Sequence, residues 1–213
     1  MKLYHVHREN KYDELFKEGN VIEFGKENNY LKECYYENSG LFTTVEELED
    51  GKHIKKYSSF SGALRPEVFD SFSKGNQRDL LEMLRDYINL TSEYNREIIV
   101  EEIRKNEFAN KPSREKCMFL TDERNLEYWY NKLCKDTSRF EFLSDDPIKV
   151  FEVEAKGNLF ESSIDLLPGI YDMNLNIKEN SNRYWTPSEY HLNNSYPNEY
   201  LLEGQAKILR RIK

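Results

Sequence analysis

The chain has few of the residues that indicate a disulfide-stabilised or metal-binding protein. Among its 213 residues only three are cysteine, Cys34, Cys117 and Cys134, and they form no CxxC pair. An odd number of widely spaced cysteines is typical of free thiols in a reducing compartment. No Cys/His spacing resembles a zinc site. We therefore expect no metal cofactor.

Long apolar runs are also missing. No stretch approaches the length that crosses a bilayer, and the first residues, MKLYHVHREN, become polar at once, unlike a secretory signal. These absences predict a cytoplasmic protein without a membrane partner.

The chain lacks an excess of positive charge. Its 31 Lys and Arg residues stand against 39 Asp and Glu residues, which gives a net charge of -8. An acidic surface disfavours general binding to a nucleic-acid backbone, although a local basic patch could still accept a dinucleotide. Aromatic residues, by contrast, are plentiful, with 15 Tyr and 12 Phe, and suit either a ring-rich core or a stacking surface.

Hydrophobic periodicity predicts one strand and several helices in the first half of the chain. These are a strand at 2–7, a helix at 11–18 that ends at Gly19, a short helix at 44–50 within otherwise irregular residues 20–60, and a pair of solvated helices over 66–108.

The second half predicts more strands. The expected elements are a strand at 117–121, a helix within 122–135, a strand from 148 that ends at Gly157, a short helix within 158–168, and one or two strands within 198–212 that turn near Gly204. This order of elements, with mainly antiparallel pairing, indicates the α+β class.

Four short motifs lie among these elements: YHVHR at 4–8, KPSREKCMFLT at 111–121, LEYWY at 126–130 and EYLLEG at 199–204. In this order they resemble the ADP-ribosyltransferase-like superfamily and, more narrowly, an uncharacterised bacterial family of the DUF2441 type. The resemblance covers residues 1–25 and 96–213. It implies a single domain over 1–213, with a split antiparallel sheet as its core and residues 26–95 as an insertion of irregular and helical structure.

The resemblance implies an enzyme that cleaves the nicotinamide–ribose bond of NAD and transfers ADP-ribose to an unknown acceptor, whether protein, nucleic acid or small molecule. Such cleavage passes through an oxocarbenium-like transition state, which a carboxylate beside the ribose stabilises. In the family this carboxylate is a Glu on a late strand, and Glu199 matches it. Glu203 is a rival, because four residues along a strand return to the same face, whereas Tyr200 and Leu202 face the other way.

The first strand supplies the second implied catalytic residue. In the family a His or Arg on this strand binds the ribose of the adenosine half, and His5 fits that role after Tyr4. On a strand His5 and His7 share one face, and Val6 and Arg8 share the other. Either the His pair or Arg8 therefore lines the cleft, and His5 is preferred.

Other NAD contacts follow from the resemblance. Arg114 could bind the pyrophosphate by bidentate hydrogen bonds, Ser113 could bind ribose, and an aromatic ring within 128–130 could stack on the nicotinamide. The implied NAD-binding set is His5, Arg8, Ser113, Arg114 and Tyr128. The strand CMFLT lacks the Ser-Thr or Tyr motif of the family at this stage, so the second catalytic motif is unassigned.

Structural explanations compete with these roles. The pattern at His5 is equally that of a strand histidine whose ring is hydrogen-bonded within the fold. Arg114 also suits a surface ion pair and Glu199 a solvated strand residue. Tyr184 and Trp185 suit packing. For the whole chain, the alternatives are an NAD hydrolase, an RNA phosphotransferase, or a non-catalytic domain that binds a nucleotide or protein. The acidic charge counts against the phosphotransferase, and the missing motif suits the non-catalytic domain.

Overall fold

The structure is a computed structural model that describes residues 2–8, 13–25, 41–47, 53–59, 77–136, 147–167, 177–194 and 197–213. The chain divides into two compact units, one formed by 1–28 with 97–213 and the other by 29–96. The second unit overlaps the stretch 26–95 that the sequence analysis treats as an insertion.

A strand pair and most of a long helix form the second unit. Strands β3 (Leu41–Glu47) and β4 (His53–Ser59) pair antiparallel, with Leu41 opposite Ser59. Helix α4 (Gln77–Glu107) runs for 31 residues without a break and enters the first unit at Glu97. The prediction of a pair of helices is therefore wrong over this range, while residues 66–76 lie outside the described residues.

The short helix predicted at 44–50 is also wrong, because residues 44–47 belong to β3. Residues 48–50 lie outside the described residues. Two threonines and a valine, Thr43, Thr44 and Val45, favour an extended chain, and β4 pairs with the backbone groups that face it. Cross-strand pairing therefore overrides the helix-like pattern of the charges that follow.

The first unit contains five strands and the remaining helices among the described residues. Its elements are β1 (Leu3–Arg8), η1 (Asp13–Leu15), β2 (Val21–Phe24), β5 (Met118–Leu120), α5 (Leu126–Asp136), β6 (Ile148–Ser163), η4 (Ile164–Leu166), α6 (Ile177–Trp185), α7 (Glu189–Asn194) and β7 (Asn198–Arg211). All pairings in this five-stranded sheet are antiparallel. The chain is therefore α+β, as its sequence predicts.

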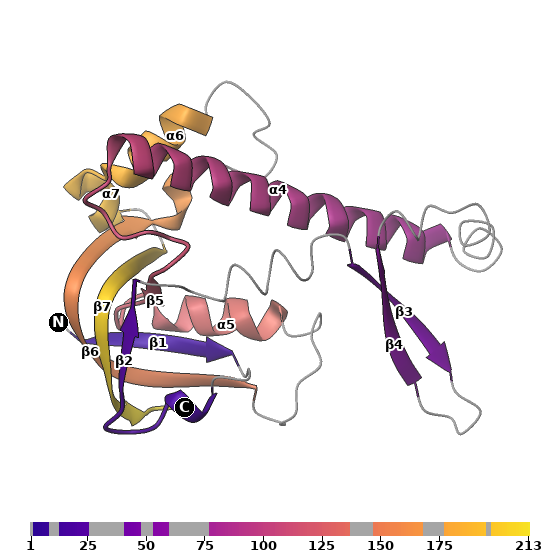
Figure 1. Cartoon of the computed structure of the whole chain (residues 1–213), viewed down its shortest axis with the longest axis horizontal. Helices are drawn as coiled ribbons and strands as arrows, with labels where there is room; N and C mark the ends of the chain where they lie inside the picture. The colour runs from indigo at the N-terminus through magenta and orange to yellow at the C-terminus, as the bar shows by residue number, and fades with distance from the viewer. Residues whose placement is uncertain are drawn as a thin grey trace. The chain divides into compact units, whose positions relative to one another are not determined.

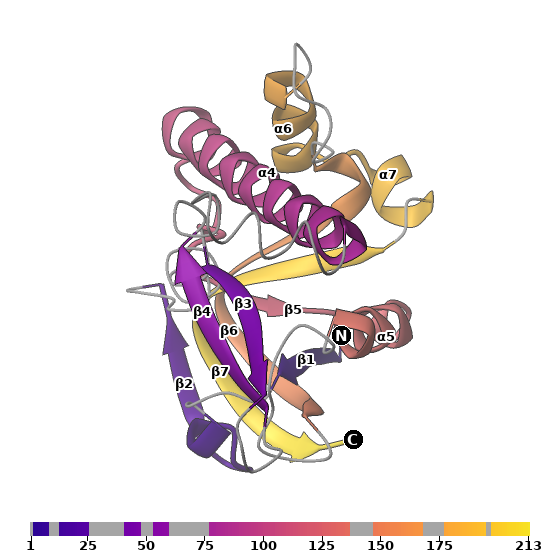
Figure 2. The same cartoon turned by 90° about the vertical axis from the view of Figure 1, so that its right-hand side faces the viewer.

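Strands β6 and β7 organise the sheet. They lie side by side from Phe151 opposite Arg211 to Ser163 opposite Asn198, and both curve strongly (Figures 1 and 2). The other edge of β6 pairs with β1, and the other edge of β7 pairs with β2 and β5. An isolated bridge between Tyr4 and Thr121 links β1 back to the end of β5, so the pairing closes in a ring β1–β6–β7–β5.

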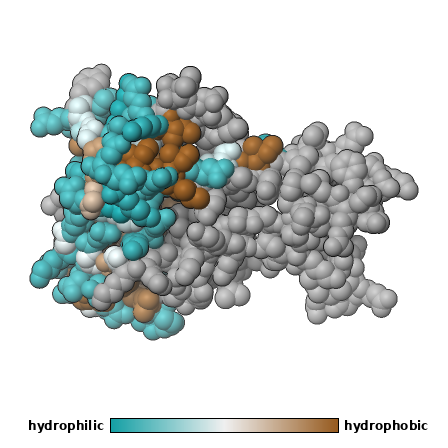
Figure 3. Space-filling model, turned by 45° about the horizontal axis from the view of Figure 1, so that its top comes forward, coloured by the Kyte–Doolittle hydropathy of each residue, from teal (hydrophilic) through white to brown (hydrophobic). Residues whose placement is uncertain are grey.

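Side chains of β7 alternate between two cores. Tyr200 and Leu202 belong to a cluster that also includes Leu3 of β1 and Met118 of β5. Leu201 belongs to a second cluster with residues of α4 and α6, among them Val100, Tyr184 and Trp185. Among the described residues, the surface seen in Figure 3 is mostly hydrophilic around a hydrophobic patch. The sheet of the first unit is thus covered on both sides at β7.

The remaining helical predictions are partly right. Residues 13–15 form only a single 3-10 turn within the helix predicted at 11–18, and residues 11 and 12 lie outside the described residues. Gly19 follows with φ of 85°, the left-handed conformation expected of a helix-ending glycine. Over residues 158–167, the described part of the helix predicted within 158–168, only η4 is helical, because β6 continues to Ser163.

Two glycines predicted to end or turn strands instead face each other inside the long pair. Gly157 of β6 lies opposite Gly204 of β7, with φ of 142° and 143°. A Cβ on Gly157 would come within 2.4 Å of the carbonyl oxygen of Glu203, and one on Gly204 within 2.3 Å of that of Lys156. Only glycine lets the two backbones approach this closely, so the pair keeps both strands continuous where β7 changes its partner from β2 to β5.

Replacing Gly157 with alanine should lower the free energy of unfolding by about 2 to 4 kcal/mol, because a Cβ there adds a backbone clash to an unfavourable φ. Gly19→Ala is the matched control, since Gly19 also has positive φ but no atom within 4 Å of a built Cβ. It should cost only about 1 kcal/mol. Urea unfolding followed by the fluorescence of Trp129 and Trp185, which both belong to the first unit, measures the two. Equal losses would contradict the close approach.

Candidate functional site

A buried guanidinium, that of Arg114, lies at the centre of a buried polar cluster in the first unit. Its Nε donates to Glu97 Oε2 at 2.7 Å, and its Nη1 donates to Glu199 Oε1. The same Nη1 donates to the Tyr184 hydroxyl at 2.5 Å. We call Glu97, Arg114, Tyr184 and Glu199 the Arg114 network. Three of its members are charged and all four are nearly inaccessible to solvent.

Four separate elements supply this network. Glu97 lies on α4, Tyr184 on α6 and Glu199 on β7, while Arg114 lies in the segment between α4 and β5. That segment is held in a tight turn, because the backbone N–H groups of Lys116 and Cys117 both donate to the Ser113 carbonyl. The turn directs Arg114 between the helix and the sheet. One side chain therefore links elements that are far apart in the sequence.

Tyr184 provides a second hydrogen-bond donor to Glu199. Its hydroxyl donates to Glu199 Oε1 at 2.7 Å while accepting from Arg114. Burial, and the Glu199 carboxylate beside it, raise the pKa of Tyr184, so the hydroxyl stays protonated and available as a donor. Burial alone would lower the pKa of Arg114, but Glu199 and Glu97 raise it well above its ordinary value. A permanently charged Arg114 and a neutral Tyr184 thus hold the carboxylate of Glu199.

A second set of bonds fixes the turn from its other side. The Ser113 hydroxyl donates to Glu101 Oε1 at 2.8 Å, and the Ser113 N–H donates to Glu203 Oε1 at 3.0 Å. Arg104 also donates to Glu101 at 2.9 Å. Ser113 is only 2% exposed, and its hydroxyl hydrogen is already donated to a carboxylate. In this arrangement the hydroxyl does not face a ligand.

His5 lies half-buried on β1, away from this network. Its Nδ1 bonds the carbonyl oxygen of Phe119 at 2.9 Å, and its ring stacks on Phe16 with centroids 5.1 Å apart. Because that carbonyl can only accept, Nδ1 carries the hydrogen and Nε2 is left with a lone pair. Burial, with the charge of His7 nearby, lowers the pKa of His5 from 6.5 to about 3. His5 is therefore a neutral imidazole at physiological pH.

The two implied catalytic residues lie on opposite sides of the sheet. His5 shares a strand face with Leu3 and packs on Phe16, both on the side of the first cluster. Glu199 shares a face with Leu201 and bonds Tyr184, both on the side of the second cluster. Strand β5 lies between them, paired with β7 and, through the Tyr4–Thr121 bridge, joined to β1.

Of the implied NAD-binding residues, Ser113 and Arg114 lie beside Glu199, but the others do not. Arg8 is the last residue of β1, opposite Ile148. Tyr128 lies on α5, where it packs edge-on against Trp129 at 5.4 Å. The indole of Trp129 in turn donates to the Asn198 carbonyl at 2.9 Å, a packing role.

Glu97 and Tyr184 are the members of the Arg114 network that sequence reasoning missed. Glu97 is one of many acidic residues on a charged helix, and Tyr184 looks like a packing residue beside Trp185. The tyrosine is indeed fully buried, yet its hydroxyl is bonded to charged groups. The sequence offers two signals, a tyrosine that looks buried and an excess of acidic residues. Neither signal shows which residue pairs with Arg114.

Comparison with known proteins places the chain in a family. A model described as "Protein of unknown function (DUF2441)" matches residues 3–213. The chain belongs to the DUF2441 family. No curated protein matches it.

Among the described helices none is both long and apolar enough to cross a membrane. Within the same residues no group of three His, Cys, Asp or Glu side chains is arranged to hold a metal ion.

Removing the central cation should strongly destabilise the first unit. Arg114→Ala leaves Glu97 and Glu199 buried without their counter-charge, so the free energy of unfolding should fall by about 3 to 5 kcal/mol. Arg183→Ala is the matched control, because Arg183 and Glu179 form an ion pair with both side chains about 60% exposed. Its effect should stay within about 0.5 kcal/mol. Similar losses in the two variants, measured by urea unfolding, would show that the network is not buried as described.

His5 should make stability depend on acidity. Since its pKa falls from 6.5 to about 3 on folding, only the unfolded chain takes up this proton between those values. The free energy of unfolding should therefore decrease as pH falls below about 6.5. His5→Asn removes this term and should lose less stability than the wild type between pH 7 and pH 5. Equal losses in the two proteins would mean that His5 is protonated equally in both states.

Proposed function

We propose that this chain is an ADP-ribosyltransferase-like enzyme that binds NAD, cleaves its nicotinamide–ribose bond with Glu199 as the catalytic carboxylate, and transfers ADP-ribose to an acceptor. The observation that supports this is the way Glu199 is held. Its carboxylate lies on β7 at the start of the EYLLEG motif and is fixed by Arg114 and Tyr184. It is therefore a preorganised anion at the position that the motif assigns to the catalytic Glu.

A fixed anion suits this reaction. Cleavage leaves positive charge on the ribose ring, and a negative group that is already oriented stabilises that charge without reorganising during the step. The proposal assigns Arg114 and Tyr184 as positioning residues, because both act through Glu199. Because Glu97, Tyr184 and Glu199 already accept from Arg114, the proposal gives Arg114 no bond to the pyrophosphate.

Access to Glu199 is the main requirement of the proposal. Glu199 is only 3% exposed, and Tyr184, which donates a hydrogen bond to it, is fully buried. NAD therefore reaches the carboxylate only if Tyr184 moves aside when the ligand binds. His5 does not share the side of Glu199, so the proposal rests on Glu199. The free Nε2 of His5 can accept a bond from a ribose hydroxyl only if the bound ligand extends past β5.

The second candidate is a non-catalytic domain that binds a nucleotide. The observation in its favour is the burial of Glu199 between Arg114 and Tyr184, which is also how a purely structural ion pair is built. In this case Glu199 holds the sheet to its helices, and a nucleotide binds without being cleaved.

Nicotinamide release separates the two candidates. Wild-type protein incubated with NAD should release nicotinamide, and Glu199→Gln should reduce the rate at least about a hundredfold, because glutamine keeps the hydrogen bonds but not the charge. NAD affinity, measured by calorimetry, should change little. Glu154→Gln, an exposed residue of β6, is the control with the same loss of charge and should keep the wild-type rate.

Each other outcome has a defined meaning. Wild-type protein that binds NAD but releases no nicotinamide would contradict the enzyme and support the non-catalytic domain. Release that needs no acceptor except water would identify an NAD hydrolase. Neither binding nor release at millimolar NAD would contradict both candidates.

A further inference from the structure

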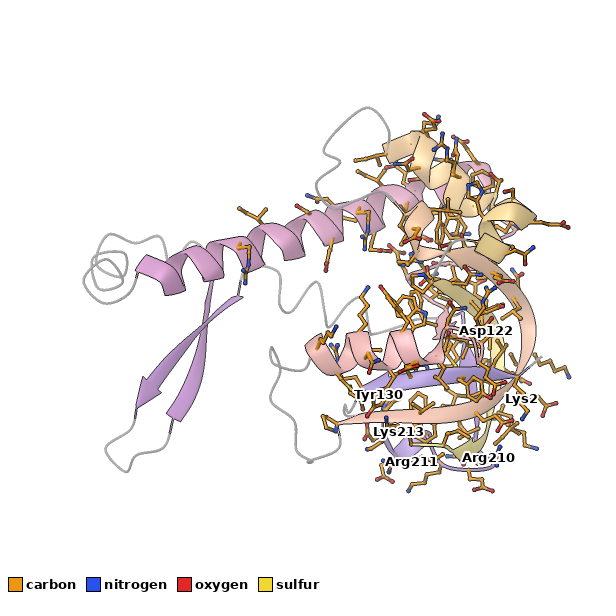
Figure 4. The ribbon with its side chains drawn as sticks, turned by 180° about the vertical axis from the view of Figure 1, so that it is seen from behind. Lys2, Asp122, Tyr130, Arg210, Arg211 and Lys213 are labelled. Atoms are coloured by element: carbon orange, nitrogen blue, oxygen red, sulfur yellow. The ribbon has the colours of Figure 1, made fainter. Side chains whose placement is uncertain are left out.

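A polar pocket of about 340 Å³ lies on the first unit, away from the Arg114 network. It opens between the residues that precede α5, strands β6 and β7, and helix α7. The side chains that decide its chemistry are Asp122, Arg124, Glu161, Glu189 and Tyr200. Figure 4 labels Asp122 near the start of α5, apart from the pair formed by Tyr130 and Lys213. Glu161 and Tyr200 are opposite one another in the β6–β7 register, so they share a face that Glu199 does not.

The pocket has an excess of negative charge. Asp122, Glu161 and Glu189 supply three carboxylates, against the single positive charge of Arg124. None of these three carboxylates forms an ion pair with another described residue, whereas Arg124 donates to the carbonyl oxygen of Leu192 at 3.0 Å. Like charges that share a cavity repel each other, so a ligand with positive charge is favoured there.

Two of the carboxylates are oriented by bonds behind them. Asp122 Oδ1 accepts from both the backbone and the side chain of Asn125, at 2.9 and 2.7 Å, which leaves Oδ2 on the side of Tyr200. Glu161 Oε1 accepts from Asn198 Nδ2 at 3.0 Å. Tyr200 is the neighbour of both carboxylates, and each keeps further lone pairs, so the pocket presents fixed acceptors.

Tyr200 adds a buried polar group to this pocket, and Asn198 lies behind two of the residues that line it. Tyr200 is 3% exposed, yet it lines the pocket, and its hydroxyl lies 3.4 Å from Asp122 Oδ2, longer than a good O–H···O bond. Asn198 is fully buried and bonds two lining residues, Glu161 and Leu192, through Nδ2. Its Oδ1 has no hydrogen-bond partner in the part of the chain that the structure describes. Buried acceptors are rarely left unsatisfied, so this oxygen adds an unpaired acceptor to the structure directly behind the pocket.

We propose that this pocket binds a small organic cation with ammonium or guanidinium groups, either as a free molecule or as a Lys or Arg side chain of another protein. Such a group carries several N–H donors and no acceptor, which matches a cavity of carboxylate oxygens. The volume is at the lower end for small-molecule sites and suits a ligand the size of a diamine or an amino-acid side chain. The site faces the other side of the sheet from Glu199 and does not depend on the NAD reaction.

Agmatine, which carries one guanidinium and one ammonium, is a suitable probe. Calorimetry with the full chain, in low salt and without NAD, should show one site with a Kd below about 1 mM. Glu189→Gln should weaken binding about fivefold or more, because Glu189 is exposed on α7 and its charge can be removed without disturbing the core. Glu154→Gln, with the same change of charge outside the pocket, should leave the Kd unchanged.

Two results would overturn the proposal. One is no binding at about 10 mM agmatine. The other is equal weakening by Glu189→Gln and Glu154→Gln, which would indicate attraction to the acidic surface as a whole. A parallel titration with a blocked arginyl peptide distinguishes the sources: tighter binding of the peptide supports a protein side chain, and tighter binding of agmatine supports a free molecule.

Discussion

The contact of one guanidinium with two buried carboxylates is the interaction on which the first unit depends. Glu97 and Glu199 lie between the helices and the sheet, where an unpaired carboxylate would be strongly unfavourable. Arg114 supplies their counter-charge, and Tyr184 supplies one further donor. Satisfying these groups together determines how three parts of the chain are oriented. They are α4 at Glu97, α6 at Tyr184 and the turn at 113–117.

Strand alternation then separates three kinds of polar site. One face of β7 carries Glu199 and Glu203 toward the Arg114 network and the turn. The opposite face carries Tyr200, which lines the acidic pocket with Glu161. His5 lies on the same side as Tyr200 but on β1, bonded to the backbone of β5. Any ligand that uses both His5 and Glu199 must therefore extend past β5, whereas a ligand of the pocket need not approach Glu199.

Local patterns in the sequence predict the parts of this fold that depend on neighbours along the chain. The α+β class, the first strand, helix α5 and the shared face of Glu199 and Glu203 follow from alternation and helical spacing, and the structure confirms them. The continuity of β6 and β7 does not follow, because Gly157 and Gly204 look like strand ends until they are seen to face each other. The Arg114 network does not follow either, since Arg114 and Tyr184 are 70 residues apart and only tertiary packing pairs them.

The most direct test of the central claim is a double-mutant cycle between Arg114 and Glu199. The free energies of unfolding of Arg114→Met, Glu199→Gln and the double variant would be compared with the wild type in urea. If the two side chains form a buried pair, Arg114→Met leaves Glu199 without its counter-charge, and Glu199→Gln removes one of the two carboxylates that pair with Arg114. The double variant should therefore be about 2 kcal/mol or more stable than the sum of the single losses predicts. Losses that add within about 0.5 kcal/mol would contradict a buried Arg114–Glu199 pair and the fixed carboxylate that rests on it.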